Sequence, residues 1–266
     1  MHPYTIKVVT KKEEIQKVVE FQEKIWGTKN VTPFPFLVAS IHNGGVLIGA
    51  FQGKSLVAFC YGFPGMDKGN VFLVSHMMAV SSALRNSGIG NDLKMTQKEW
   101  ALEQGYEKIR WTFDPLESRN AYLNIRKLGG YSKTFLPNHY GDMEDELNGG
   151  LPSDRLLLEW DLKQTIRERE MIPANTECLI RLSNTTRIPL RVENNVKWDA
   201  GYYKVPVPKD IHKIKQQDFA IAKKWRLFIG YCFQTLFELG YEIVDFLQTE
   251  EPVNYYIVKK MEGEND

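Results

Sequence analysis

A glycine-bearing turn is the feature of this sequence whose residue types and spacing are best suited to chemistry. It runs from Arg85 through Gly88 to Gly90, between a strand-like segment and a helical one. Glycines let the backbone approach an anion, the N-terminus of the following helix favours negative charge, and Arg85 adds charge-assisted hydrogen bonds. The turn predicts a phosphate or pyrophosphate site, although a glycine pair before a helix is also an ordinary tight turn. The three glycines of the dinucleotide fingerprint and the Gly-Lys-Ser/Thr of a Walker loop are both absent from it.

A histidine on the preceding strand is the candidate for proton transfer. Side chains alternate along a strand with a period of two, so His76, Met78 and Val80 are expected on one face of the segment Val71 to Val80. An imidazole with an unperturbed pKa near ~6.5 can accept a proton from an amine at neutral pH. We interpret His76 as a general base, with a hydrogen-bonded core histidine as the alternative.

The strands and helices that position these residues alternate along the sequence. This alternation predicts an α/β fold. The first half is expected to contain strands at 4–10, 46–52, 56–62, 71–80, 108–113, 131–135 and 155–162, and helices at 11–26, 34–42, 89–104 and 118–128. A turn is expected at 65–69 and a polar excursion at 137–153. The second half is expected to contain strands at 177–182, 187–192, 202–207, 241–247 and 255–260, and one long helix at 209–239.

A change of composition after Leu162 predicts a domain boundary. The charged stretch 163–170 and the sequence Pro173-Ala174-Asn175 resemble a domain connection, which gives a first domain of residues 1–162 and a second of 163–266. In the second domain, Trp225 and Arg226 on the long helix are interpreted as a packed face with one arginine reaching to solvent.

Composition excludes several function classes. The 266 residues include 34 basic and 33 acidic ones, interleaved along the chain, which argues against a general nucleic-acid binder. No apolar run reaches the ~18 to 20 residues that cross a bilayer, and the first residues lack an apolar leader, so we expect a cytoplasmic protein without a membrane partner. Three separated cysteines suggest buried thiols, and no spacing suggests a metal site.

The turn, in this order of elements, resembles the acyl-CoA signature of the GNAT superfamily of N-acyltransferases. That signature is Arg or Gln, two residues, Gly, one residue, and Gly or Ala, led by an apolar strand residue; Val80, Arg85, Gly88 and Gly90 match it. The segment 114–129, ending in Lys-Leu-Gly, resembles the superfamily helix that supports the pantetheine arm of CoA. The resemblance covers residues 4–162, and a likeness of 210–246 to a group of two-part members extends it over the whole chain.

The resemblance implies a mixed, mostly antiparallel sheet, splayed beside strand 71–80 and flanked by helices, with a smaller C-terminal α+β domain. It implies an acyl-CoA co-substrate, acetyl-CoA or another such as succinyl-CoA, and a small-molecule primary amine as acceptor, an amino acid being one such amine. The oligomeric state is left open, with a homodimer as one alternative. His76 matches the place of a histidine in the arylalkylamine branch, and His139 and Tyr140 fall where the superfamily shapes its acceptor pocket. The implied CoA-binding residues are Met78, Ala79, Val80, Arg85, Asn86, Ser87, Gly88, Ile89, Gly90, Asn120 and Asn124.

The sequence departs from the superfamily at one chemical position. Many members carry a tyrosine four residues before the helix-ending glycine, where it protonates the leaving thiolate, but Ile125 stands four before Gly129. Tyr122 lies on another helical face, so the role is not transferred to it, and water or a loop residue is the expected proton source. A non-catalytic CoA-binding module and a protein-interaction module therefore stay open as alternatives.

Overall fold

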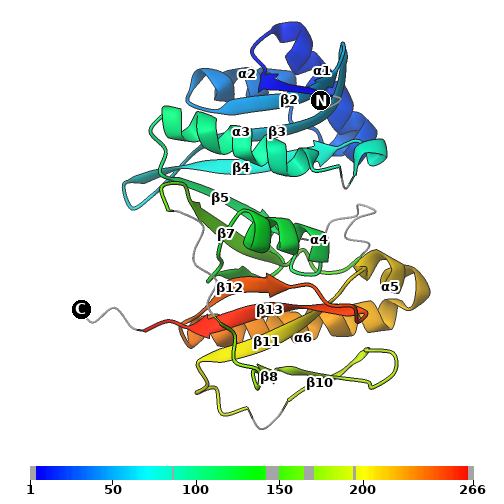
Figure 1. Cartoon of the computed structure of the whole chain (residues 1–266). Helices are drawn as coiled ribbons and strands as arrows, with labels where there is room; N and C mark the ends of the chain where they lie inside the picture. The colour runs from blue at the N-terminus through cyan, green and yellow to red at the C-terminus, as the bar shows by residue number, and fades with distance from the viewer. Residues whose placement is uncertain (1–3, 86, 142–149, 165–170, 194–195, 263–266) are drawn as a thin grey trace. The chain divides into compact units, whose positions relative to one another are not determined.

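Two compact units make up the computed structural model, which describes residues 4–85, 87–141, 150–164, 171–193 and 196–262 (Figure 1). The first unit comprises the described residues of Met1–Trp111 and Asp161–Thr165, and the second those of Thr112–Trp160 and Ile166–Asp266. Residues 112–160 thus pack with the C-terminal part of the chain. The division of function at residue 162 stays a prediction.

The first unit is built on a mixed sheet in the order β1-β2-β3-β4-β5. Its pairs from β1 to β4 are antiparallel, whereas β4 and β5 are parallel. Together with the helices described below, this confirms the α/β fold class. The strands are β1 (Thr5–Val8), β2 (Val46–Gln52), β3 (Ser55–Asp67), β4 (Asn70–Val80) and β5 (Lys108–Phe113), whose last two residues enter the second unit.

The β3–β4 hairpin is longer than the sequence predicts. Its turn lies at Lys68 and Gly69, both with positive φ, the conformation that a tight two-residue hairpin requires. Gly65 lies inside β3, opposite Phe72 of β4, and not in the expected turn at 65–69.

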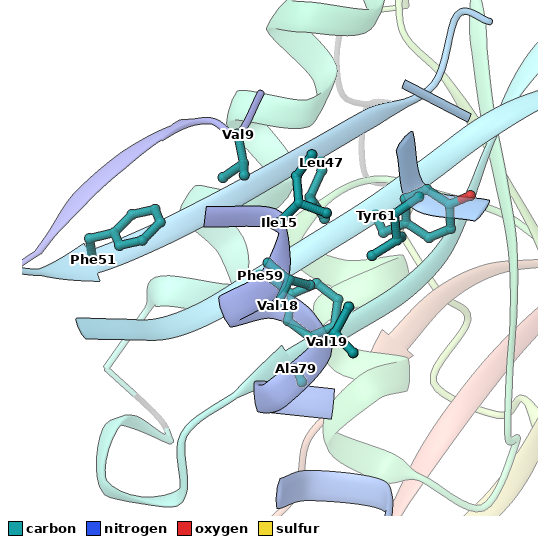
Figure 2. Packing of buried hydrophobic residues seen from close by; sticks show 10 residues of the cluster. Val9, Ile15, Val18, Val19, Leu47, Phe51, Phe59, Tyr61 and Ala79 are labelled. Atoms are coloured by element: carbon teal, nitrogen blue, oxygen red, sulfur yellow. The ribbon is translucent and has the colours of Figure 1, made fainter. Parts of the chain in front are cut away.

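Helices cover this sheet. They are α1 (Lys12–Trp26), α2 (Phe34–His42) and α3 (Ile89–Glu103), with short 3-10 turns η1 (Thr28–Asn30) and η2 (Ser82–Leu84). The apolar stripe of α1 is buried against β2 and β3, as its helical spacing predicts. Figure 2 shows this core, which consists of Val9, Ile15, Val18, Val19, Leu37, Leu47, Phe51, Phe59, Tyr61 and Ala79.

The second unit begins with irregular elements. They are α4 (Ser118–Ala121), the π-helix η3 (Tyr122–Lys127), and the antiparallel strands β6 (Phe135–Leu136) and β7 (Arg155–Asp161). The helix expected over 118–128 therefore changes from α to π after one turn. The strand expected over 131–135 is reduced to an isolated bridge from Tyr131 to Glu159, followed by β6.

A four-stranded sheet in the order β12-β13-β11-β8 forms the rest of the second unit, together with a β10-β9 pair. The long helix expected over 209–239 is two helices, because Asp218 is extended and its carboxylate caps α6 by accepting from the amides of Ala220 and Ile221. The elements are β8 (Glu177–Cys178), β9 (Ile180–Leu182), β10 (Pro189–Val192), β11 (Tyr202–Pro208), α5 (Ile211–Gln217), α6 (Phe219–Glu238), β12 (Tyr241–Leu247) and β13 (Val253–Lys260).

Within the described residues, the helices are too short or too polar to cross a bilayer. The same part of the chain holds no group of three or more metal-ligating side chains.

Candidate functional site

The parallel strands β4 and β5 separate after a short contact, and we call the place where they part the fork. Their pairing covers Leu73 with Ile109 and Val74 with Arg110. On its other edge, β4 stays paired with β3 as far as Val80. The last third of β4 therefore has one edge directed toward the fork, as the expected splay beside this strand requires.

Backbone groups of two residues face the fork. The amide of Ser81 donates to the carbonyl of Val57 on β3, and alternate residues of a strand direct their amides to the same side. The amides of Met78 and Val80 consequently point away from β3, toward the fork. Ala79 instead directs its backbone to β3 and packs its side chain in the core, so only two of the three residues expected to pair with pantetheine offer their amides there.

A β-bulge at His76 interrupts the alternation of β4. Met77 lies opposite Tyr61, and Ser75 lies opposite the next β3 residue, Gly62, so His76 is the extra residue between them. The expected common face of His76, Met78 and Val80 is therefore wrong, because the bulge resets which side each residue faces.

The two faces of β4 pack against different helices. The His76 ring lies 5.6 Å from the Phe63 ring and 6.3 Å from the Tyr61 ring, and both aromatic residues pack on the α1 and α2 side. Met78 pairs with Cys60, whose thiol approaches the carbonyl of Leu93 on α3. His76 thus lies on the α1 and α2 face, whereas Met78 lies on the α3 face.

The environment of His76 suits a proton acceptor. His76 is exposed, and packing of its ring against the two aromatic rings lowers the pKa of His76 through partial burial. The ring is therefore neutral at neutral pH. Tyr61 is itself held by a 2.6 Å hydrogen bond between its hydroxyl and that of Ser40.

The glycine turn that the sequence predicts as an anion site contains a backbone conformation that favours glycine. Gly88 is left-handed, with φ at 91°, and precedes the first residue of α3; a Cβ there would meet open space, so the position is constrained by φ and not by crowding. Arg85, Ser87 and Gly88 are exposed, and Ser87 donates from its hydroxyl to the carbonyl of Leu84. The predicted residue Asn86 lies outside the described residues.

The side chain of Ile89 anchors this turn. It is buried, which fixes the start of α3, while Gly90 lies in the first helical turn. The first amides of a helix have no acceptor within the helix, so they point out of its N-terminus toward solvent. A pyrophosphate would find backbone donors and the positive end of the helix dipole together there.

The predicted pantetheine contacts of η3 and α4 are in the second unit. Asn120 is exposed, whereas Asn124 is 4 % exposed, so the two asparagines do not share one surface as their four-residue spacing predicts. Ile125, at the position of the superfamily tyrosine, is buried core.

The predicted acceptor residues are held by a hydrogen-bonded turn. The amide of Tyr140 donates to the hydroxyl of Ser153 over 2.9 Å, and the amide of His139 donates to the Ser153 carbonyl over 3.1 Å. The Tyr140 hydroxyl lies 2.9 Å from that of Thr112, and the His139 and Tyr140 rings are 4.5 Å apart. This part of the polar excursion is ordered, and residues 142–149 lie outside the described residues.

A buried ion pair lies behind that turn. Arg226 of α6 is 3 % exposed and donates through both terminal nitrogens to Asp114, at 2.9 and 2.5 Å. Asp154, 3.9 Å from the Arg226 guanidinium, accepts from the amide of Asn138 in the turn. The interpretation of Arg226 as solvent-reaching is therefore wrong, because its carboxylate partner stands 112 residues away, where no local pattern shows it.

Sequence reasoning also missed Lys94, a buried lysine of α3 whose ammonium lies at the fork. Helical spacing marked its neighbour Leu93 for burial, but nothing in the pattern distinguished Lys94 from an exposed helix lysine. Its Nζ lies 2.6 Å from the hydroxyl of Ser75, the residue that precedes the bulge.

Comparison with known proteins matches most of the first unit and the first residues of the second. Residues 14–125 match the model of the Acetyltransferase (GNAT) family. No curated protein matches the chain significantly.

Among solved structures, similarity extends over about three fifths of the chain. An acetyltransferase of the GNAT family from Streptococcus pneumoniae is 13% identical, with 59% of this chain and 98% of that chain covered and a TM-score of 0.48. An aminoglycoside 6'-N-acetyltransferase complexed with coenzyme A is 14% identical, covering 60% and 98%, with a TM-score of 0.47. An IAA acetyltransferase from Bacillus cereus is 18% identical, covering 59% and 99%, with a TM-score of 0.45.

Proposed function

We propose that the protein, whose residues 14–125 match the model of the Acetyltransferase (GNAT) family, transfers an acyl group from an acyl-CoA to the primary amine of a small molecule. The observation that carries the proposal is the continuity of one binding path within the first unit. The amides of Met78 and Val80 at the fork lead along β4 into the turn that ends at the left-handed Gly88.

The residues of this path fit CoA by their chemistry. Pantetheine carries two amides, which match the alternate backbone groups of Met78 and Val80. The pyrophosphate is an anion, which matches Arg85, Ser87 and the exposed N-terminus of α3. When bound, acyl-CoA supplies a thioester carbon that an amine nitrogen can attack.

His76 is the proposed general base. It takes a proton from the acceptor's ammonium group, or from the nitrogen as the new bond forms, and its lowered pKa keeps the imidazole free to do so at neutral pH. The amide of Met78 donates to the carbonyl oxygen as negative charge develops there.

The acceptor is proposed to be a small amine such as an amino acid, with acetyl or succinyl as the acyl group. His139 and Tyr140 are the proposed acceptor contacts, and their turn is already held by Ser153 and Asp154. A screen of acyl-CoA donors against amino acids and polyamines, with detection of released thiol, tests the reaction and names both substrates.

A second candidate function is favoured by one observation. Ile125 is buried core where many superfamily members have the tyrosine that protonates the thiolate, and a CoA-binding module without catalysis needs no such group. CoA-dependent thermal stabilisation without thiol release in the screen would favour this reading over the enzyme.

A further inference from the structure

The fork contains a buried ammonium group that the proposed mechanism does not use. Lys94 projects from α3 and is 3 % exposed. Its Nζ lies 2.6 Å from the Ser75 hydroxyl and 3.7 Å from the centroid of the Trp111 ring. Ser75 and Trp111 are the residues that follow the last pair between β4 and β5, Val74 with Arg110. The ammonium is therefore placed where the two strands begin to separate.

The polar contacts of Lys94 in the described structure are with neutral groups. Besides Ser75, the Oε1 atom of Gln97 lies 3.4 Å from Nζ, and Gln97 also accepts from the Ser75 hydroxyl. The Trp111 ring face attracts a cation but carries no net charge. Removing an ammonium from water without a counter-charge costs several kcal/mol, so packing alone does not explain a lysine where methionine would fill similar space.

The charge is present under ordinary conditions. Burial lowers the pKa of Lys94 to about 8, which leaves most of the group protonated at neutral pH. The neighbouring Cys60 thiol on β3 has its pKa raised to about 12 by burial and stays neutral. His76, next to Ser75 on β4, is neutral as well. Among the described residues, the printed contacts of the Lys94 ammonium thus include no carboxylate that would balance its charge.

We propose that the ammonium of Lys94 stabilises the thiolate that acyl transfer releases at the fork. This inference rests on the proposed function, since it takes the fork as the place of the thioester end of CoA. As the acceptor nitrogen forms its C–N bond, the C–S bond breaks and its electron pair stays on sulfur, while His76 takes the proton from nitrogen. Lys94 keeps its own proton, and water later protonates the sulfur.

The proposal accounts for the substitution at Ile125. A fixed cation lowers the free energy of the thiolate, so the leaving group no longer needs a proton donor in contact with it. The superfamily tyrosine and Lys94 would both stabilise the leaving thiolate, the tyrosine by proton transfer and the lysine by its charge.

The test is the ionisation of the thiol of CoA bound to the full chain, followed by the ultraviolet absorbance of the thiolate. An opposite charge nearby lowers a pKa by about 1 to 3 units, so the bound thiol should ionise at lower pH than that of free CoA. Lys94→Met should raise this pH by about 1 unit or more. Lys98→Met, the same change on the same helix, should leave it unaltered.

Each result is decisive. An equal ionisation pH in wild type and a folded Lys94→Met variant overturns the inference while leaving the proposed function intact. If Lys94→Met does not fold, wild type alone decides, because a bound thiol that ionises at or above the pH of free CoA also overturns it. Failure of wild type to bind CoA overturns the proposed function itself, and this inference with it.

Discussion

At the scale of single residues, the proposed chemistry of the first unit depends on two basic groups on opposite faces of β4. His76 lies in the bulge against Tyr61 and Phe63, and Lys94 reaches Ser75 from α3. Burial lowers the pKa of both groups, but their normal values differ, so at neutral pH the imidazole is neutral and the ammonium is charged. One group can accept a proton while the other supplies charge.

Replacement of His76 should separate catalysis from binding. A positioned base contributes about 10² to 10⁴ in rate, so His76→Gln should lower turnover by that order while CoA affinity stays the same. In wild type, turnover should fall as pH drops through the lowered pKa of His76, because only the neutral ring accepts a proton. Turnover against pH checks both; a variant with near-normal turnover and an unchanged pH profile would place the base elsewhere, with Tyr140 and His139 next to be tested.

Stability of Lys94 variants should depend on pH in a defined direction. The folded pKa of about 8 lies below the ordinary value of 10.5, so between these limits the unfolded chain holds a proton that the folded chain lacks, and folding becomes more favourable as pH rises. Lys94→Met removes this dependence. Urea unfolding should show the free energy of unfolding of wild type rising relative to that of Lys94→Met from pH 8 toward pH 10.5, and a pH-independent difference between the two would contradict the assignment of a charged, buried Lys94.

At the scale of elements, the turn before α3 and the fork beside it form the proposed site. The strands, α1 and α3 follow from hydrophobic spacing, and the turn follows from its glycines. The bulge at His76 does not, because the flanking residues Val74, Ser75, Met77 and Met78 do not alternate between apolar and polar, so one extra residue leaves no sign in a pattern of period two. The break at Asp218 was missed for a related reason, since helical spacing continues on both sides of the capping residue.

A valine in the turn should abolish CoA binding. Gly88→Val places a β-branched side chain at φ 91°, which strains the backbone by about 1 to 2 kcal/mol and shifts the amides that would hold the pyrophosphate. The CoA-dependent rise in melting temperature should disappear. Gly105→Val is the matched control, because Gly105 also has positive φ and open space around it but lies at the other end of α3. Equal CoA-dependent stabilisation in a folded Gly88→Val variant would refute the site.

At the scale of the whole molecule, the C-terminal elements are structural partners of residues 112–160. Tyr256 donates from its hydroxyl to the carbonyl of Pro115, Asn254 donates to Ser118, and Arg226 pairs with Asp114. Because the C-terminal segment is dense in aromatic residues, the sequence predicts that it does not form a free domain. It does not predict these partners, because contacts between residues more than 100 positions apart leave no local pattern.

Loss of the buried arginine should destabilise the second unit. Arg226→Met leaves Asp114 without its bidentate partner and removes the nearby charge from Asp154, and breaking a buried pair in this way costs about 3 to 5 kcal/mol. Lys224→Met, an exposed change on the same helix, should cost little. Chemical unfolding measures both, and a loss below about 1 kcal/mol for Arg226→Met would mean that the ion pair does not support the turn carrying His139 and Tyr140.

Removal of the residues after Leu162 should expose Asp114 and Pro115, which they cover in the full chain. A chain ending at Leu162 retains Asp114 and Pro115 but lacks Arg226 and Tyr256, so we expect it to aggregate or to lose the ordered turn. Size-exclusion chromatography and activity are the checks. A shortened chain that is soluble, monomeric and fully active would show that the C-terminal elements are dispensable.

Amine acylation from acyl-CoA at the fork and turn can be measured as amine-dependent thiol release together with mass analysis of the amine. Wild type should release thiol from acetyl-CoA or succinyl-CoA only when an acceptor is present, and the acceptor should gain the mass of the acyl group. Gly88→Val should release none above background. Wild type that binds CoA but acylates no amine in a panel of amino acids and polyamines, or a Gly88→Val variant that acylates as fast as wild type, would rule out acyl transfer at this site.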